Sequence, residues 1–261
     1  MGRAHAGWPG WAREQVLEQS RLWVSPWRPP TAVPAVVGSF EMYVVDGAEA
    51  TLVTCHTQAR DGRDFVRGAL DAATRCGASS LQLTIGPDYP GTEAMIGELV
   101  ERGAQVVATD DILAAEPPST ASRIAPSPDV DVVQVCTFPD VVDFERISAR
   151  GWGYPEPTTE QHEDAYARLT PGWFLARCDE QRAGTAGFAL VGEVARLWGA
   201  AVVPALRGRG VYRTLVRHRL VAAHTQGATL ALVHAAPTSS PILQRLGFAK
   251  FGERHTFRVT L

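Results

Sequence analysis

The chain has 261 residues, a formal net charge of −3, and 45% hydrophobic and 20% charged residues. This composition is typical of an ordinary soluble globular protein, long enough for one large domain or two small ones. The small net charge gives no global attraction to nucleic acid or to an anionic membrane, and no apolar run approaches the roughly 20 residues that span a bilayer. The N-terminus lacks the apolar core of a signal peptide. We therefore expect a cytoplasmic protein with no nucleic-acid or membrane partner, and the oligomeric state stays open.

The four cysteines are Cys55, Cys76, Cys136 and Cys178, which lie far apart and form no C-x-x-C pair. This spacing argues against a zinc site and against a disulfide framework. All four lie in or beside apolar runs, so we expect reduced, buried thiols and no metal.

The first half of the chain predicts a helix over residues 66–76, a strand over residues 80–85 and a short helix that ends at Gly103. Glycines directly after a periodic apolar segment are typical helix stops.

A proline-rich stretch follows. Residues 114–129 hold four prolines and three serines, a composition that predicts neither a helix nor a central strand. We expect a domain over residues 1–116, a linker over residues 117–129 and a second domain over residues 130–261.

The second half alternates strand and helix patterns from residue 130 onward. In chain order the sequence predicts a strand at 132–137, a helix at 139–150, a helix capped by Thr158 to about residue 169, strands at 173–178, 183–191 and 195–203, a helix at 212–224, a strand at 229–234, a helix at 239–246, and two strands near 248–253 and 255–260.

The two halves resemble each other at a constant separation of 150 residues. Residues 66–78 and 216–228 share seven identities, and each segment is followed by an apolar strand and by a short helix that ends in a glycine. The repeated order of elements indicates an internal duplication.

The segment Arg207–Gly210 joins an apolar strand to a helix and carries two arginines and two glycines. Backbone N–H groups in such a turn point into one concavity, and the start of the helix adds about half a positive charge. Glycine lets the backbone approach a phosphate closely. The turn therefore predicts a site for a phosphorylated ligand. Its counterpart in the first half, Thr57–Arg60, has no glycine and one arginine.

The second half resembles the GNAT superfamily of acyl-CoA N-acyltransferases. The resemblance depends on Val202-Val203-Pro204-Ala205-Leu206-Arg207-Gly208-Arg209-Gly210 and, about 40 residues later, on Leu246-Gly247-Phe248. The family's last small loop residue is replaced by Tyr212. The resemblance implies an α/β (α+β) fold with mixed, V-splayed sheets flanked by helices. The first half is similar to a degenerate second copy, as in tandem members of the superfamily.

The resemblance also implies that acetyl-CoA, or another acyl-CoA, is the co-substrate. Val202 would pair with the pantetheine arm, the turn would bind the diphosphate through backbone N–H groups, and the serines either cap the following helix or contact the arm. The residues expected to bind acyl-CoA are Val202, Val203, Arg207, Gly208, Arg209, Gly210, Val211, Tyr212, Ser239 and Ser240.

The catalytic groups are less clear from the sequence. Acyl transfer to an amine needs a base, because an amine with a pKa near 10 is mostly protonated at neutral pH. His234 and Glu193 are the candidates, and their alternatives are a packed histidine and a turn carboxylate. Where the family often has a tyrosine acid, this chain has Leu243.

The acceptor is expected at the loop that carries Trp152, Tyr154 and Glu156, where aromatic rings could pack on a small organic amine and the carboxylate could bind its charge. The alternative is that the two rings only cover the core. The sequence predicts an N-acetyltransferase with a small-molecule amine acceptor. A non-catalytic acyl-CoA-binding protein, or a thioester hydrolase, is the alternative.

Overall fold

A computed structural model describes residues 10–25, 27–29, 31–56, 61–87, 89–179 and 181–261. Contacts between residues divide the chain into two compact units. Unit 1 contains Leu113–His234 and Pro241–Lys250, together with residues 10–12. Unit 2 contains Arg13–Ile112, Ala235–Ser240 and Phe251–Leu261. Each unit is a mixed sheet flanked by helices, which is the architecture that the sequence predicts.

The sheet of unit 2 has the strand order β1-β2-β3-β4-β11-β5. β3 and β4 are parallel, whereas β1 with β2, β2 with β3, and β4 with β11 are antiparallel. The elements of this unit are α1 (Arg13–Arg21), β1 (Val33–Val37), β2 (Phe40–Val45), β3 (Glu49–Cys55), α2 (Gly62–Arg75), β4 (Ser80–Ile85), α3 (Thr92–Glu101), most of β5 (Gln105–Ala115) and most of β11 (Ala249–Thr260).

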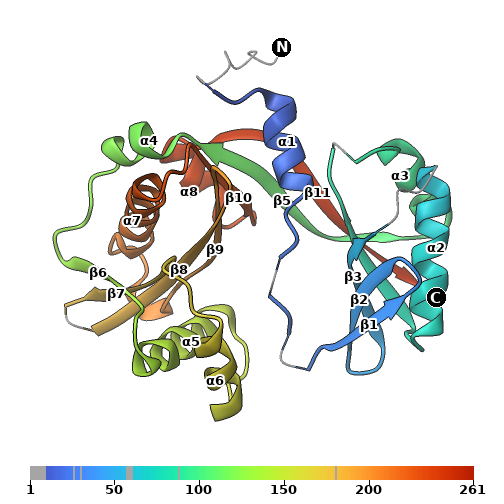
Figure 1. Cartoon of the computed structure of the whole chain (residues 1–261), viewed down its shortest axis with the longest axis horizontal. Coiled ribbons are helices and arrows are strands. Elements are labelled where there is room, and N and C mark those ends of the chain that lie inside the picture. Colours follow the sequence, from blue (N-terminus) through green and yellow to red (C-terminus); the bar gives the residue numbers. More distant parts are fainter. Residues whose placement is uncertain (1–9, 26, 30, 57–60, 88, 180) are drawn as a thin grey trace. The chain divides into compact units, whose positions relative to one another are not determined.

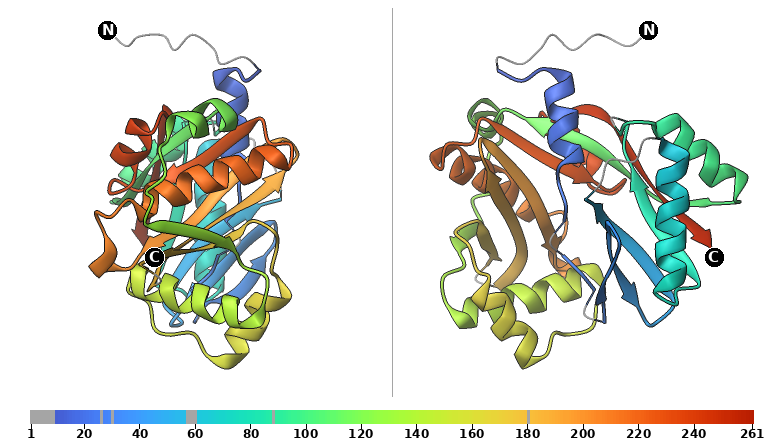
Figure 2. Two further views of the ribbon diagram at one scale, coloured as in Figure 1. Left: turned by 90° about the vertical axis from the view of Figure 1, so that its left-hand side faces the viewer. Right: turned by 45° about the vertical axis from the view of Figure 1, so that its right-hand side comes forward.

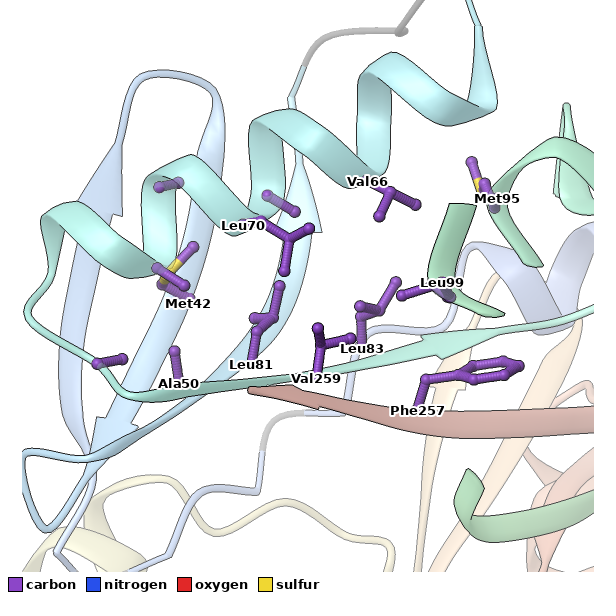
Figure 3. Close-up of a cluster of buried hydrophobic side chains, with 14 of the residues drawn as sticks. Met42, Ala50, Val66, Leu70, Leu81, Leu83, Met95, Leu99, Phe257 and Val259 are labelled. Atoms are coloured by element: carbon purple, nitrogen blue, oxygen red, sulfur yellow. The ribbon is translucent and has the colours of Figure 1, made fainter. Parts of the chain in front are cut away.

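The core of unit 2 lies between α2 and the sheet. Val66 and Leu70 are one turn apart on α2, and Leu81 and Leu83 alternate along β4, so each element presents one apolar face to the other. Figure 3 shows these four side chains pointing toward one another. Figure 2 shows α2, in cyan, lying along the strands of this unit.

The sheet of unit 1 has the strand order β10-β9-β8-β7-β6. β9 and β10 are parallel, and the other neighbours are antiparallel. The elements are α4 (Pro117–Arg123), β6 (Val130–Gln134), α5 (Phe138–Trp152), α6 (Thr159–Ala167), β7 (Trp173–Cys178), β8 (Gln181–Val191), β9 (Val194–Val202), a short 3-10 helix (Pro204–Leu206), α7 (Val211–Thr225), β10 (Leu230–Ala235) and α8 (Ser240–Arg245).

Helices cover both faces of the sheet in unit 1 (Figure 1). Trp173 and Phe174 are neighbours on β7, so their side chains point to opposite faces. The ring of Trp173 lies 4.7 Å from that of Phe144 on α5, and the ring of Phe174 lies 4.8 Å from that of His218 on α7. Helices α5 and α7 therefore pack on opposite faces, and burial against Phe174 lowers the pKa of His218.

The two units repeat one supersecondary unit, as the sequence predicts. α2, β4 and α3 in unit 2 correspond to α7, β10 and α8 in unit 1. The helix ends match in detail, because the N–H of Ala78 donates to the carbonyl of Ala73 and the N–H of Ala228 donates to that of Ala223. Each repeat also places its middle strand parallel to the strand before its first helix.

The units do not coincide with the expected domains 1–116 and 130–261. Instead of two final strands near 248–253 and 255–260, the chain ends in the single strand β11. Its residues from Phe251 onward belong to unit 2, where residues 255–260 pair with β4. Conversely, Leu113–Ala115 at the end of β5 belong to unit 1. Each half of the sequence therefore gives its last strand, or part of it, to the unit built mainly from the other half.

The expected linker at residues 117–129 contains the helix α4, which the sequence analysis excluded. Pro117 and Pro118 occupy the first turn, where a proline N–H would have no partner and the fixed φ angle suits the helix. The helix packs against α7, so this segment is a part of unit 1 rather than a free connection.

Within the described residues, no helix has the length and apolarity needed to cross a bilayer. None of the four cysteines forms a disulfide bond, and Cys178 is buried. The expectation of burial is wrong for Cys136, which is exposed, and only partly right for Cys55 and Cys76.

Candidate functional site

The turn between β9 and α7 has the backbone that the sequence predicts. Gly208 and Gly210 have φ angles of +81° and +83°, in the left-handed region that costs other residues strain. Gly210 is the residue before the first turn of α7, and Val211 begins the helix. The two glycines therefore shape the turn from which α7 starts.

A segment outside the predicted motif supports this turn. A Cβ atom on Gly210 would lie 2.9 Å from the Cβ of Ser127, so the two backbones are in close contact. The N–H of Ser127 donates to the hydroxyl of Thr214 at 3.0 Å, and that hydroxyl donates to the carbonyl of Gly210 at 3.1 Å. The sequence analysis missed Ser127 and Thr214, and the pairing has no local signal because they lie 87 residues apart.

The two arginines of the turn have different roles. The Arg207 Nε donates to the carbonyl of Val202 at 3.3 Å, and its side chain is exposed. The Arg209 guanidinium forms an ion pair with Asp179 at 2.6 Å, which raises the pKa of Arg209. The charge of Arg209 is therefore already balanced within the protein.

The start of α7 presents its N–H groups without a side-chain cap. Among the described residues, no side chain of the cap position bonds to the first turn, because that position is Gly210. A helix start without a side-chain cap and the helix dipole together favour an anion. Val211 is buried and Tyr212 is half-buried, so these two residues anchor the first turn.

The N-terminus of α2, which corresponds to that of α7, is capped by a side chain. The Asp61 carboxylate accepts the N–H of Arg63 at 3.2 Å, which places a negative charge where an anion would bind. A Cβ on Gly62 would lie 2.4 Å from the carbonyl oxygen of Gly91, so neighbouring backbone also covers this turn. The segment Thr57–Arg60, which was predicted to lack a phosphate-binding turn, lies outside the described residues. Within the described residues, the start of α2 is occupied by Asp61 and by neighbouring backbone.

Two further arginines, missed in the sequence analysis, follow the turn on α7. Arg213 and Arg217 are one helical turn apart and therefore share a face. Their counterparts 150 residues earlier are Arg63 and Arg67, both of which form ion pairs with Glu98. In the part of the chain that the structure describes, neither Arg213 nor Arg217 has an acidic partner. The repeat was the signal that could have found them.

β9 and β10 separate where the resemblance predicts a splayed sheet. Their parallel pairing runs from Leu230 opposite Val194 to Leu232 opposite Arg196, and no later pair is found between these fully described strands. Val202 pairs with Gly184 on β8, and the N–H of Val203 donates to the carbonyl of Ala183 on the same side. The edge of β9 that faces β10 is therefore not paired near Val202.

The two candidate bases lie at different ends of the strands. His234 comes two residues after the last β9–β10 pair, at the separating end, and it is half-buried. Glu193 is exposed in the turn before β9, where its carbonyl accepts the N–H of Thr229. Val202 is the ninth residue after Glu193 along the strand, which corresponds to about 30 Å at the usual rise. Of the two candidates, only His234 lies at the end of the strands where β9 leads into the turn Arg207–Gly210.

Leu243 and the two serines are part of the packing around α8. Leu243 is 1% exposed, so an apolar core residue stands where the family often has its acid. The N–H groups of Ser239 and Ser240 both donate to the carbonyl of Ala236 at 2.9 Å. The Ser240 hydroxyl donates to the Asp111 carboxylate, and the Ser239 hydroxyl to the carbonyl of Ala236. Both serine hydroxyls are therefore engaged within the protein.

The expected acceptor loop follows α5. Trp152 and Tyr154 are 52% and 44% exposed, so neither ring simply covers the core. The Glu156 carboxylate forms a 2.6 Å ion pair with Arg146, and this pairing already balances the charge that was expected to bind an amine. Among the described residues no group of three possible metal ligands is found.

Comparison with known families finds one match, and it covers the part of the chain that contains this site. Residues 140–248 match the model of the acetyltransferase (GNAT) family. The matched segment includes the turn Arg207–Gly210, α7, β10 and α8. No curated protein matches the sequence significantly.

Solved structures of similar fold cover most of the chain. A GCN5-related N-acetyltransferase from Kribbella flavida is 17% identical, with a TM-score of 0.60 over 88% of this chain and 90% of that chain. A GCN5-related N-acetyltransferase from Sphaerobacter thermophilus is 14% identical, with a TM-score of 0.67 over 85% and 76%. A tandem GNAT protein from the clavulanic acid biosynthesis pathway is 16% identical, with a TM-score of 0.62 over 90% and 85%. At these identities the likeness establishes the fold.

Proposed function

We propose that this protein is a cytoplasmic N-acetyltransferase that moves an acetyl group from acetyl-CoA to the amine of a small acceptor. Unit 1 would bind the acyl-CoA, and the first half of the sequence is a degenerate copy of the same domain. The observation that carries the proposal is the difference between two equivalent helices. The start of α7 has no side-chain cap, and among the described residues Arg213 and Arg217 have no acidic partner. The start of α2 is capped by Asp61, and its Arg63 and Arg67 form ion pairs with Glu98.

The residues of unit 1 fit the phosphate groups of coenzyme A. Backbone N–H groups at the start of α7 would bind the diphosphate, and Arg207 and Arg213 would supply positive charge. The unpaired edge of β9 near Val202 would bond to the amide groups of the pantetheine arm, as a strand does. When bound, acetyl-CoA supplies an activated acetyl group as a thioester.

The test of acyl-CoA binding is a charge reversal on α7. Arg213→Glu should weaken acetyl-CoA binding at least about tenfold, because a charge-assisted hydrogen bond contributes about 1.5–3 kcal/mol. Arg150→Glu is the matched control, since Arg150 is an exposed arginine on α5, which packs on the opposite face of the sheet. Equal affinity of the two variants in titration calorimetry would reject the assignment of the phosphate site.

His234 is the residue that we assign to proton removal from the acceptor. It lies where β9 and β10 separate, and a histidine changes charge near neutral pH. Leu243 cannot donate a proton to a departing thiolate. A thiol has a pKa near 8.5, so its thiolate can leave without a strong acid, at a modest cost in rate.

A second candidate function is acyl-CoA binding without transfer, which the buried Leu243 favours. Release of free thiol from acetyl-CoA, measured across a panel of small amines, separates the alternatives. Release that requires an amine supports the transferase. Release at the same rate without amine indicates thioester hydrolysis, and tight binding with no release indicates a binding protein.

A further inference from the structure

A polar cavity of about 100 Å³ lies beside α4 in unit 1. One wall is a face of this helix and its cap, because the residues that form it are spaced as i, i+3, i+4 and i+7: Glu116, Ser119, Thr120 and Arg123. The other wall is Gly247, two residues after the end of α8. A helix face that packs on a neighbour usually carries an apolar stripe at this spacing. Here the stripe is entirely polar, which favours contact with a polar ligand.

Gly247 keeps the cavity open. Its φ angle is +101°, in the left-handed region that glycine adopts at low cost. A Cβ atom at this position would lie 3.6 Å from Cγ2 of Thr120 and 3.8 Å from Nη2 of Arg123, so any side chain here would occupy the cavity. The volume is larger than the about 10–15 Å³ that one water needs and smaller than the roughly 300 Å³ of sites for drug-sized ligands. The cavity therefore suits a molecule of a few heavy atoms.

The cavity is lined by one acid and one base that do not pair with each other. The Glu116 carboxylate accepts the Ser119 hydroxyl at 2.7 Å, and the Arg123 Nε donates to the Ser119 carbonyl at 3.0 Å. Within the described residues, neither charged group has another hydrogen bond or an ion pair. Both side chains therefore converge on Ser119, and one carboxylate oxygen and the two terminal guanidinium nitrogens are available to a ligand.

Thr120 adds a polar group that the protein itself does not use. The residue is 1% exposed and lines the cavity. Its backbone N–H donates to the carbonyl of Glu116, but in the part of the chain that the structure describes its hydroxyl has no hydrogen bond. Hydroxyl groups of buried residues normally have a partner, because an unmade hydrogen bond is costly. A ligand in the cavity would provide this partner.

We propose that this cavity binds a small α-amino acid in its zwitterionic form. Glu116 binds the ammonium group, Arg123 binds the carboxylate, and the Thr120 hydroxyl donates to the carboxylate. A simple anion would be attracted by Arg123 and repelled by Glu116, and a simple cation would meet the reverse, so only a ligand with both charges gains from both residues. The shared contact with Ser119 brings the two charges close together, as the two charges of an α-amino acid are. The proposal does not depend on the proposed function.

Three matched ligands test the need for both charges in the unaltered full chain. Propionate is L-alanine without the ammonium group, and ethylamine is L-alanine without the carboxylate. In titration calorimetry at neutral pH, L-alanine should bind about tenfold or more tightly than either, because each analogue loses one charge-assisted bond. Propionate or ethylamine that binds as tightly as L-alanine overturns the proposal. So does the absence of binding by L-alanine, glycine and L-serine at millimolar concentration.

Two variants test the assigned partners. In Glu116→Gln the affinity for L-alanine should fall about tenfold and approach that for propionate, whereas in Arg123→Gln it should approach that for ethylamine. Glu160→Gln on α6 and Arg245→Gln on α8 are the matched controls, since both residues are exposed and neither lines the cavity. An unchanged affinity for L-alanine in either cavity variant would reject the zwitterion site.

Competition separates this cavity from the proposed acyl-CoA site. None of the residues that line the cavity is among those expected to bind acyl-CoA, so coenzyme A should not displace L-alanine. Coenzyme A without an acyl group is the probe, because no transfer can then take place. Displacement of L-alanine would show that the cavity is part of the acyl-CoA site and would overturn a separate amino-acid site. Binding of L-alanine by a protein that does not bind coenzyme A would reject the proposed function and leave this site standing.

Discussion

Asp61 and Gly210 each precede the first turn of one of the two equivalent helices α2 and α7, although they are one position apart in the repeat of 150 residues. The Asp61 carboxylate accepts a hydrogen bond from the N–H of Arg63, whereas Gly210 has no side chain and a φ angle of +83°. One half of the duplication thus satisfies its helix start internally. The other half has no side-chain cap at its helix start, and this difference supports our proposal that the phosphate site lies in unit 1.

Gly210 should be less replaceable than Gly208. Both have positive φ angles, so alanine at either position should cost about 1–2 kcal/mol of stability. Only at Gly210 would the new Cβ also meet Ser127, at 2.9 Å, whereas Gly208 has no atom within 4 Å on that side. Urea unfolding should show Gly210→Ala to be the less stable variant.

Ser127→Gly provides the matched rescue. It removes the contacting Cβ and keeps the Ser127 N–H that donates to Thr214. The double variant should return to the stability of Gly208→Ala, because only the positive-φ cost remains. Equal stability of Gly208→Ala and Gly210→Ala would show that the contact with Ser127 is not tight.

Glu98 should stabilise unit 2 in a pH-dependent manner. Its buried carboxylate accepts from Arg63, Arg67 and Arg102, chiefly from Arg67, and these bonds lower the pKa of Glu98 to about 2. A carboxyl group with a lowered folded pKa stabilises the fold above its unfolded pKa of about 4.5, and the effect is lost as the pH falls toward 2. Glu98→Gln should therefore lower the free energy of unfolding at pH 7.

The same variant should lose less, relative to the unaltered protein, as the pH falls from 5 to about 3. Glu93→Gln, at an exposed carboxylate in the first turn of α3, is the control and should change stability by less than about 0.5 kcal/mol. A difference between Glu98→Gln and the unaltered protein that is constant over this pH range would contradict the ionic role of Glu98.

Much of the local structure could be predicted from the sequence, because periodic apolar patterns and helix stops are local signals. The strand Trp173–Cys178 has the bounds expected for it, and the helix capped by Thr158 begins where expected. The location of β11 could not be predicted. Phe257 and Val259 alternate as they should in a strand, but this alternation fits the sheet of either unit equally well.

The candidate site, like the fold, could be predicted from the sequence only where the signal is local. The turn could be predicted because its glycines are a local signal in the sequence. The duplication could have pointed to Arg213 through its counterpart Arg63. The ion pair between Arg209 and Asp179 joins two separate turns, and no local pattern predicts such a partner. The prediction of a linker without a helix at Pro117 was wrong because the effect of a proline depends on its position. A proline in the first turn favours a helix, whereas a proline in the interior breaks one.

The exchange of strands makes the C-terminal residues essential for unit 2. Phe257 is 5% exposed and Val259 is 2% exposed, and both belong to the core that α2 covers. Phe257→Ala should destabilise this unit by about 3–5 kcal/mol, and Phe257→Leu by clearly less. Denaturant unfolding measures both. A fragment of residues 130–261 should not be a stable domain, and a soluble, folded fragment would contradict this account of β11.

His234→Ala should lower turnover without weakening the binding of acetyl-CoA. The reason is its place two residues beyond the last pair of β9 and β10, outside the turn Arg207–Gly210 that we propose to bind the diphosphate. A base must be neutral to accept a proton, so the rate in the unaltered protein should rise with pH as the imidazole loses its proton. In the variant this rise should disappear, and activity should increase only at the higher pH where the free amine becomes abundant. His224→Ala, on the exposed end of α7, is the matched control. An unchanged pH profile in His234→Ala would remove this residue from the mechanism, while a weaker affinity for acetyl-CoA would indicate that its role is to shape the site.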